Sequence, residues 1–375
     1  MADLPPARSL TAAELMRQLG FKFPTPVLER TTASRAPAPR YDLPFAEGFR
    51  ELRPAVEPRR LHVTNGDSAA GTLRLSGIAG EVSITADPLH EGSAPGGLPP
   101  ERWRKVRARH LAEGGYDDYD SVLATLTRWD RALEDARSYD EVVLWFEHDL
   151  FDQLLLIRSL DLLAGLDLGG TALSLVQSGE YLGYLTPQEM AALLPERRPV
   201  GDDQKRLARE AWRAFRAPDP RRIEGVLAGD TSPLPYLEGA LLRHLEEFPE
   251  VADGLSRSER QILRALDSGA AAFEEVFRAT QGMEERIYMG DSSFHRILRE
   301  LATSPRPLVR LDPPGASGSL RVLRISLTPT GREVLAGQDD WVRIRGIDRW
   351  LGGVHLQGPE AAWRWDAAAG RLAAR

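Results

Sequence analysis

The stretch that decides the fold is Val142-Val143-Leu144-Trp145-Phe146-Glu147-His148-Asp149, in which five apolar residues end abruptly in three ionisable ones. A short, continuous run of aliphatic and aromatic residues is typical of a strand that is buried on both faces of a sheet. Residues 150–163 then follow with the apolar spacing of a helix. A buried strand that leads directly into a helix is the unit from which parallel α/β sheets are built.

The same pattern recurs on both sides of this stretch. Residues 61–64, 81–85 and 172–176 are short apolar runs that end in polar clusters, and amphipathic helices are predicted over 100–113 and 118–137. The predicted fold class is therefore α/β, with a Rossmann-like parallel sheet domain followed by a helical region and a winged helix-turn-helix-like domain.

Composition shifts divide the chain into five predicted segments. The first 59 residues hold nine prolines, a density that regular elements do not tolerate, and one short helix is expected within them. Three short helices followed by a hairpin give the C-terminal half the element order of a winged helix. The segments are the proline-rich arm 1–59, the α/β domain 60–185, a helical region 186–250, a winged-helix-like domain 251–338, and a tryptophan-rich β tail 339–375.

Composition also excludes several classes of protein. Of the 375 residues, 42% are hydrophobic and the net charge is -7, which is unfavourable for a protein that coats a polyanion. There is no cysteine, so disulfides, iron–sulfur clusters and thiol nucleophiles are excluded. No apolar run is long enough to cross a membrane, and residues 1–20 lack the apolar core of a signal peptide, so we expect a cytoplasmic protein without membrane contact.

Ligands of open parallel sheets bind beyond the carboxyl ends of the strands, where loops and helix N-termini converge. Polar residues gather at each predicted strand end, and these loops are expected to form the site. The candidate ligand-binding residues are Asn65, Gly66, Asp67, Ser68, His90, Glu91, Asp149, Asp152 and Gln153. The candidate acid–base residues are Asp87, Glu147 and His148.

Imidazole and carboxylate groups without thiols form a donor set that suits Mg²⁺, Mn²⁺, Fe²⁺ or Zn²⁺. The sequence does not fix a cofactor; a divalent metal is the candidate, with Asp87, His90, His148 and Asp149 as its ligands. Small residues at 66–71 open a predicted helix, so backbone N–H groups there could approach a phosphate or carboxylate. The standard phosphate-loop and dinucleotide fingerprints are absent.

A structural interpretation stands beside the functional one. Ser68, Asp149 and Asp152 occupy predicted N-cap or first-turn positions, where such residues stabilise a helix whatever the function. Histidines in loops beside carboxylates, such as His90 and His148, fit either interpretation.

Three blocks of this chain resemble the domain-of-unknown-function family numbered 1835. They are residues 61–68, 87–92 and 145–154, and the resemblance covers about residues 60–180. The family carries no established reaction, so the resemblance supports the choice of loops and implies no activity.

Gly66-Asp67-Ser68 also resembles the nucleophile block of the GDSL-type esterases. Asp87 and His90 would then complete a triad with Ser68. In that family, however, the Asp and His lie near the C-terminus, which argues against this alternative.

The predicted winged helix has a weak charge. Residues 254–335 hold about 12 arginines against about 10 acidic residues, whereas a DNA reader normally has a strongly basic face. Arg296 and Arg299 on the predicted third helix are the candidate nucleic-acid contacts. The other interpretation is that this region packs against the α/β domain or another protomer.

Two functions from different classes follow. In the first, the α/β domain binds a small anionic or phosphorylated ligand, with a divalent metal, for metal-assisted hydrolysis or group transfer. In the second, the protein is a ligand-sensing regulator or interaction protein whose winged helix binds DNA or a protein partner.

Overall fold

The computed structural model describes residues 57–312 and 323–375, so the helix predicted within the N-terminal arm lies outside the described residues. The largest sheet has five strands in the order β2-β1-β4-β5-β6. All neighbours in it are parallel except the β5–β6 pair. Its strands are β1 (Arg60–Thr64), β2 (Glu81–Ile84), β4 (Glu141–Phe146), β5 (Ala172–Gln177) and the two-residue edge β6 (Arg198–Pro199). The predicted α/β fold is confirmed.

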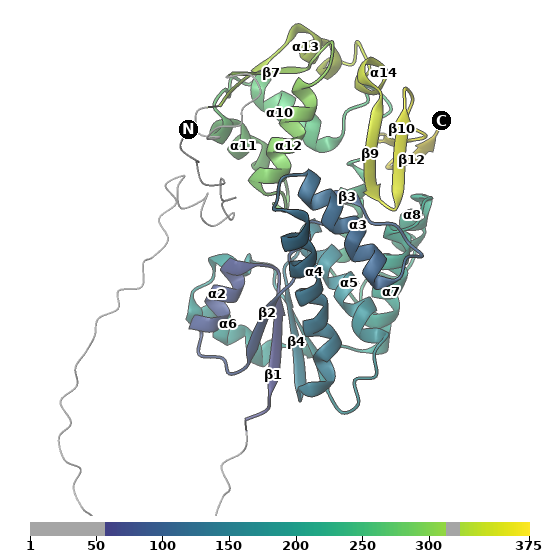
Figure 1. The fold of residues 1–375 in the computed structure, drawn as a ribbon. Helices are drawn as coiled ribbons and strands as arrows, with labels where there is room; N and C mark the ends of the chain where they lie inside the picture. Colours follow the sequence, from purple (N-terminus) through teal and green to yellow (C-terminus); the bar gives the residue numbers. More distant parts are fainter. Residues whose placement is uncertain (1–56, 313–322) are drawn as a thin grey trace, which may run out of the picture.

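Helices cover both faces of the sheet because the side chains of each strand alternate between them. Val143 and Trp145 of β4 pack with α2 (Asp67–Leu75) and α6 (Pro187–Leu193). Leu144 and Phe146 belong to the main core on the opposite face. The helices of that face are α3 (Pro100–Glu113), α4 (Tyr119–Glu134), α5 (Leu150–Ala164) and α7 (Asp202–Phe215), as Figure 1 shows.

The chain changes direction between β1 and β4, which are neighbours in the sheet. β1 leads into α2 on one face, and β4 leads into α5 on the other. The first turns of α2 and α5 therefore diverge above the carboxyl ends of adjacent strands. Open α/β sheets bind their ligands at such switch points.

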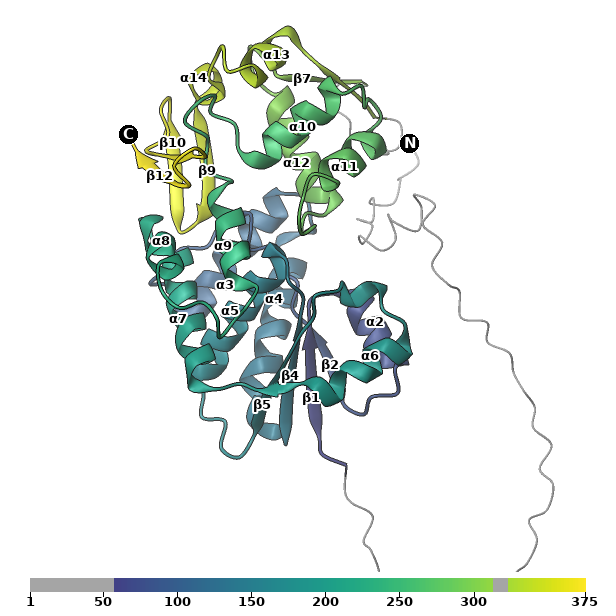
Figure 2. The same cartoon turned by 180° about the vertical axis from the view of Figure 1, so that it is seen from behind.

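Helices α8 and α9 continue the layer that α7 begins. They span Arg221–Leu227 and Leu237–Leu245. Figure 2 shows α9 rising from this layer toward the C-terminal helices. These are α10 (Arg257–Asp267), α11 (Phe273–Gln281) and α12 (Asp291–Ala302), followed by the antiparallel pair β7 (Val309–Asp312) and β8 (Arg324–Leu327), then α13 (Pro329–Leu335) and α14 (Trp341–Arg345).

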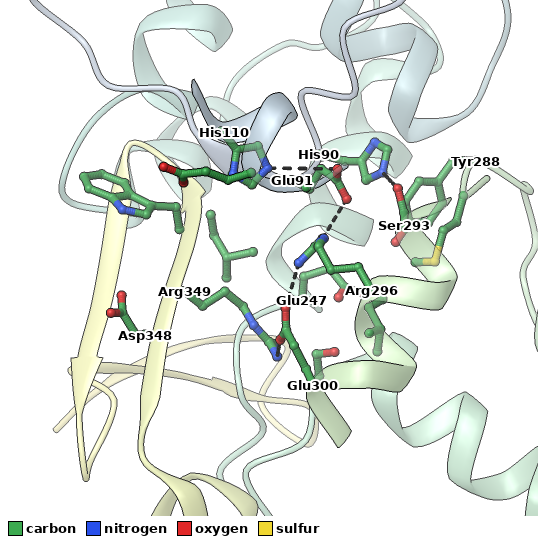
Figure 3. Close-up of a pocket in the computed structure, with 18 residues that line it drawn as sticks. His90, Glu91, His110, Glu247, Tyr288, Ser293, Arg296, Glu300, Asp348 and Arg349 are labelled. Atoms are coloured by element: carbon green, nitrogen blue, oxygen red, sulfur yellow. Dashed lines mark hydrogen bonds and ion pairs between the residues drawn. The ribbon is translucent and has the colours of Figure 1, made fainter. Parts of the chain in front are cut away.

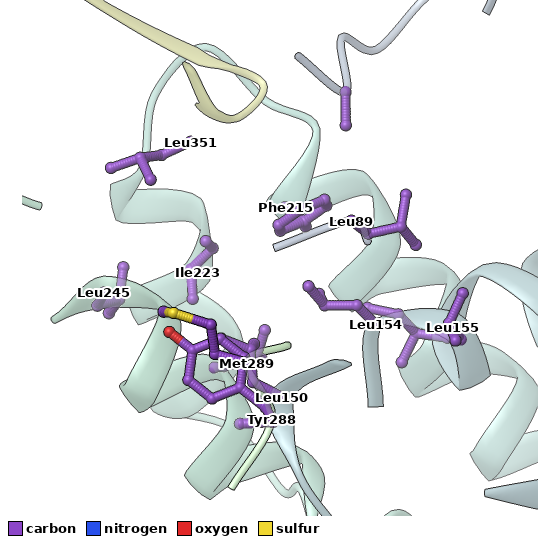
Figure 4. Packing of buried hydrophobic residues seen from close by; sticks show 14 of the residues in the cluster. Leu89, Leu150, Leu154, Leu155, Phe215, Ile223, Leu245, Tyr288, Met289 and Leu351 are labelled. Atoms are coloured by element: carbon purple, nitrogen blue, oxygen red, sulfur yellow. The ribbon is translucent and has the colours of Figure 1, made fainter. Parts of the chain in front are cut away.

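The C-terminal tail forms strands from Ile347 onward, whereas Trp341–Arg345, predicted as part of the β tail, is the helix α14. The tail strands also join the α/β part. The tail strands are β9 (Ile347–Gly352), β10 (Val354–Gly358), β11 (Trp363–Asp366) and β12 (Arg371–Ala374). β9 pairs in parallel with β3 (Gly92–Ser93), which follows the β2 loop. Leu351 of β9 shares the main core cluster with Phe215 of α7 and Leu154 of α5 (Figure 4).

No helix in the described part of the chain is long and apolar enough to cross a membrane.

Candidate functional site

The carboxyl end of β4 carries a cluster of three acidic residues. β4 is buried along its whole length and is followed by Glu147, while Asp149 is the N-cap of α5 and Asp152 lies in its first turn. Carboxyl oxygens of these three residues lie within 4.8 Å of one another, in what we call the acidic cluster. The strand end and the helix cap thus place all three by local geometry.

The acidic cluster is buried and has no cationic partner within the described part of the chain. Glu147, Asp149 and Asp152 are 5%, 3% and 1% exposed, respectively. Across residues 57–312 and 323–375, no Lys, Arg or His nitrogen forms an ion pair with any of them. A buried carboxylate is costly unless a cation or a proton neutralises it.

Neutral donors hold the cluster in place instead. The Asn65 amide, just after β1, donates to Asp152 Oδ2 at 2.8 Å, and the Glu147 backbone N–H donates to Asp152 Oδ1 at 2.7 Å. The Leu182 N–H donates to Glu147 Oε1 at 2.7 Å, and the Asp152 N–H donates to Asp149 Oδ1 at 3.1 Å. Gln153 donates to the Glu147 carbonyl at 2.6 Å, which leaves the buried Gln153 Oε1 without a hydrogen-bond partner.

Burial and mutual repulsion shift the titration of the acidic cluster. Burial, together with the charge of Asp152, raises the pKa of Glu147 to about 8, although hydrogen bonds from Asn65 and from backbone N–H groups oppose the shift. Burial and the charge of the neighbouring carboxyl groups also raise the pKa values of Asp149 and Asp152. The cluster therefore holds protons near neutral pH unless a cation takes their place.

The donor set fits a hard divalent cation. Carboxylate oxygens are what Mg²⁺ and Mn²⁺ prefer, and the acidic cluster offers three of them without sulfur or nitrogen. It is the only group of three or more His, Asp or Glu side chains with this spacing in the part of the chain that the structure describes. Glu147 and Asp152 were not predicted as metal ligands, and Asp149 is the one predicted ligand within the cluster.

His148 lies beside the acidic cluster and outside it. Its ring is 5.0 Å from the Tyr181 ring and 5.9 Å from the Tyr236 ring, and its Nδ1 is buried without a hydrogen-bond partner. Burial and the nearby Arg286 lower the pKa of His148, so the imidazole is neutral. His148 also lines a cavity of about 220 Å³ together with Leu150, Arg243 and Arg286.

Arg286 comes from the segment between α11 and α12. It donates to the His148 carbonyl at 3.0 Å and lies over the Tyr236 ring, and no carboxylate pairs with it among the described residues. The next residue fixes this segment, because the Ile287 N–H donates to the Tyr181 hydroxyl at 2.6 Å. Sequence reasoning missed Arg286 because no local pattern links it to a strand end 138 positions away.

The loop after β1, with the first turn of α2, forms the solvent-exposed side of the site. Asp67 is exposed, and Gly66 rather than Ser68 is the N-cap of α2. Ser68 lies against Gly183 of the segment that also carries Leu182, so this loop lies near the Glu147 carboxyl group. The first turn of α2 leaves backbone N–H groups at this edge.

Asp87 is not part of the acidic cluster, which corrects its assignment as a metal ligand. Arg107 of α3 binds it through Nε at 3.0 Å and Nη2 at 2.5 Å, and both side chains are buried. A guanidinium that neutralises the carboxylate in this bidentate way leaves no role for a metal there. Nothing in the sequence around Arg107 distinguishes it from the other basic residues of α3.

His90 is likewise separate from the acidic cluster. Its Nε2 is 3.3 Å from Ser293 Oγ of α12, and Glu91 pairs with Arg296 of the same helix at 2.6 Å (Figure 3). Because Asp87 and His90 are engaged with Arg107 and Ser293, they do not form a triad with Ser68. The esterase alternative is therefore not supported by the geometry.

The two candidate nucleic-acid contacts differ in their surroundings. Arg296 is held by Glu91 and Glu300, and it faces the α/β part of the molecule. Arg299 is exposed. The helix face that carries Arg296 is thus occupied by an internal contact.

No protein-family model matches this chain, and no curated protein matches it. The resemblance to family 1835 remains an expectation from the three sequence blocks.

Proposed function

We propose that the chain binds a divalent cation at the acidic cluster and uses it to act on a small anionic or phosphorylated molecule by hydrolysis or group transfer. The observation that supports this most directly is the burial of Glu147, Asp149 and Asp152 without an arginine or lysine partner among the described residues. The three carboxylates would hold the cation, and the Asn65 amide, which donates to Asp152, would orient that carboxylate. A bound divalent cation would polarise a phosphoryl or carbonyl oxygen and lower the pKa of a water molecule.

The remaining parts of the site support an anionic substrate. Arg286 lies at the cavity that His148 lines, and its positive charge is not neutralised by a carboxylate in the described residues. The N-terminal turn of α2 would add backbone donors for an anion from the other side. His148, a neutral imidazole with an unpartnered nitrogen, is suited to accept a proton.

The metal part of the proposal is tested with the full-length protein. Isothermal titration calorimetry with Mg²⁺ and Mn²⁺ should show binding by the wild type and a loss of at least about tenfold in affinity for Glu147→Gln, because a ligand and its charge are removed. Glu180→Gln is the matched control, since it removes one exposed carboxylate from the loop after β5. Equal affinities in the two variants would reject the acidic cluster as the metal site.

The catalytic part is tested separately. Release of inorganic phosphate from a panel of phosphomonoesters and nucleotides should depend on the added metal and should be lost in Glu147→Gln. Arg286→Ala should raise KM more than it lowers kcat, because Arg286 is proposed to bind the substrate anion. If the protein binds the metal but shows no metal-dependent turnover, the enzymatic part of the proposal is rejected and only the metal-binding part is retained.

We further propose that α10, α11, α12 and the β7–β8 pair form a winged helix that acts as an internal docking module. The order of these elements and the bridge between Ala272 and Arg324, which joins the start of α11 to β8, support this arrangement. The Glu91–Arg296 ion pair supports docking against the α/β part rather than DNA binding.

A further inference from the structure

A second cavity lies where the α/β part, α12 and the tail sheet meet. Its volume is about 260 Å³, and its lining includes His90, His110, Ser293, Arg296 and Trp350 (Figure 3). No member of the acidic cluster lines it. The cavity is thus distinct from the proposed catalytic site.

A chain of hydrogen bonds fixes the tautomer of His90. Glu91 is ionised: burial alone would raise its pKa, but Arg296 and hydrogen bonds from Arg296 and Tyr116 lower it to about 2. The Tyr116 hydroxyl therefore donates to Glu91 at 2.8 Å, and Ser293 Oγ, 3.2 Å from the Tyr116 oxygen, donates to that oxygen. Ser293 Oγ then accepts from His90 Nε2–H at 3.3 Å.

This arrangement leaves His90 Nδ1 with a lone pair. Burial lowers the pKa of His90 to about 4, so the ring carries one proton, and the hydrogen-bond chain places it on Nε2. Nδ1 is buried and has no partner. Among the described residues, His110 Nε2 and Arg296 Nε are also buried without a hydrogen-bond partner, although His110 Nε2 lies 4.0 Å from Glu91 Oε1. Buried polar atoms of this kind are normally satisfied by a ligand or by water.

Carboxylates outnumber arginines around the cavity, five to two, which disfavours an anionic ligand. The three less exposed ones are paired, Glu91 and Glu300 with Arg296 and Glu247 with Arg243, whereas Glu113 and Asp348 are exposed. Arg296 is paired with Glu91 and Glu300, and Arg349 is paired with Glu259 and Glu300. No other Lys or Arg of residues 57–312 and 323–375 lines the cavity. The free polar atoms are neutral imidazole nitrogens and one guanidinium N–H, surrounded by apolar side chains such as Met289 and Leu351.

We propose that this cavity binds a small uncharged heterocycle or carboxamide that donates a hydrogen bond to His90 Nδ1 and accepts one from Arg296 Nε. Nucleobases and nicotinamide belong to this chemical class, and a cavity of about 260 Å³ holds one such ring system rather than a larger cofactor. No residue of the acidic cluster lines this cavity, so ligand binding here can be tested independently of the proposed reaction.

The test is ligand-observed NMR and calorimetry on the full-length protein with adenine, cytosine and nicotinamide as probes and inorganic phosphate as the charged comparison. At least one probe should bind with a dissociation constant of roughly 1 mM or lower, the range expected for ligands of this size. His90→Phe, which keeps the ring packed against Phe151 and Tyr288, should weaken binding about tenfold. His295→Gln is the matched control, because His295 lies on α12 next to Arg296 but does not line the cavity.

Ser293→Ala provides a variant that alters no ring packing. It removes the hydroxyl that holds the Nε2 proton, so it should also weaken binding of the probe. If His90→Phe does not fold, Ser293→Ala decides the question. The proposal is overturned if no probe binds, if phosphate binds in preference, or if the probe binds equally well to Ser293→Ala and to the wild type.

Discussion

Two buried carboxyl groups have opposite surroundings: Asp87, which follows β2, and Glu147, which follows β4. Arg107 binds Asp87 in a bidentate pair, whereas Glu147 faces Asp149 and Asp152 without a cation. Both carboxyl groups lose their hydration on burial. The partner therefore decides whether the group is part of a structural ion pair or is free to bind a cation or a proton.

Asp87→Asn should destabilise the protein by about 3–5 kcal/mol, because it leaves the buried Arg107 guanidinium without a counter-charge. Urea unfolding followed by circular dichroism measures this. Asp67→Asn is the control and should change the free energy of unfolding by less than about 0.5 kcal/mol, since Asp67 is exposed. Unchanged stability together with lost Mg²⁺ binding would instead make Asp87 a metal ligand.

The acidic cluster predicts an unusual pH dependence of stability. The pKa of Glu147 is about 8 in the folded protein and about 4.3 in an unfolded chain, so its stabilising contribution is complete below pH 4.3 and is lost as the pH rises through 8. In the presence of a chelator, the melting temperature of the wild type should therefore fall between about pH 5 and about pH 8, and Mg²⁺ should restore it.

Glu147→Gln should flatten this decline in scanning fluorimetry, because a neutral amide cannot lose a proton. Glu180→Gln should retain the slope of the wild type. An identical slope in all three proteins would show that the carboxyl group of Glu147 ionises freely in the fold.

How far the sequence predicts the site depends on how local each contact is. Glu147, Asp149 and Asp152 follow one strand and open one helix, so a strand-end rule finds them together. Asp87 and His90 obey the same rule, but their partners Arg107 and Ser293 lie 20 and 203 positions further along. A periodic pattern contains no information about such pairings.

At the scale of elements, two different faces of α12 make internal contacts, one apolar and one charged. Phe294 and Leu298 pack into the core, and Arg296 reaches across to Glu91 in the loop after β2. A recognition helix of a DNA-binding protein would need this second face free. The Glu91–Arg296 ion pair therefore supports the proposed docking role, and so does the weak charge of residues 254–335.

Arg296→Ala should lower the free energy of unfolding by about 3 kcal/mol, because the buried Glu91 carboxylate loses its cation. Arg299→Ala is the matched control on the same helix and should change it by less than about 0.5 kcal/mol. Chemical denaturation measures both. The wild type should bind random duplex DNA no better than roughly 100 μM at physiological salt. Tight, salt-sensitive binding that is lost in Arg299→Ala would show that α12 is a DNA reader.

The elements themselves are largely predictable, because their periodicity is local. The four main strands of the sheet and the three helices α10 to α12 lie where the sequence places them. Two short strands were missed, β3 and β6, with two residues each. A two-residue strand is too short to show any alternation, and its partner alone defines it.

At the scale of the whole molecule, the main buried cluster runs from Leu61 in β1 to Leu372 in β12 without a break. A continuous core couples the parts, so differential scanning calorimetry of the full-length protein should show one transition whose calorimetric and van't Hoff enthalpies agree. Two resolved transitions would show that the α/β part and the C-terminal part unfold independently.

The pairing of β3 with β9 also has a consequence for biosynthesis. Gly92 and Ser93 leave the ribosome long before Leu351 and Gly352, their partners in the sheet. At translation rates of about 5–20 residues per second, this edge waits roughly 10–50 seconds for the strand that covers it. During that interval His90 and Glu91, which precede β3, lack the α12 groups that later bind them. The nascent chain thus exposes an unpaired strand edge and the Glu91 carboxylate, which is buried only in the completed fold. It is therefore a candidate client for ribosome-associated chaperones.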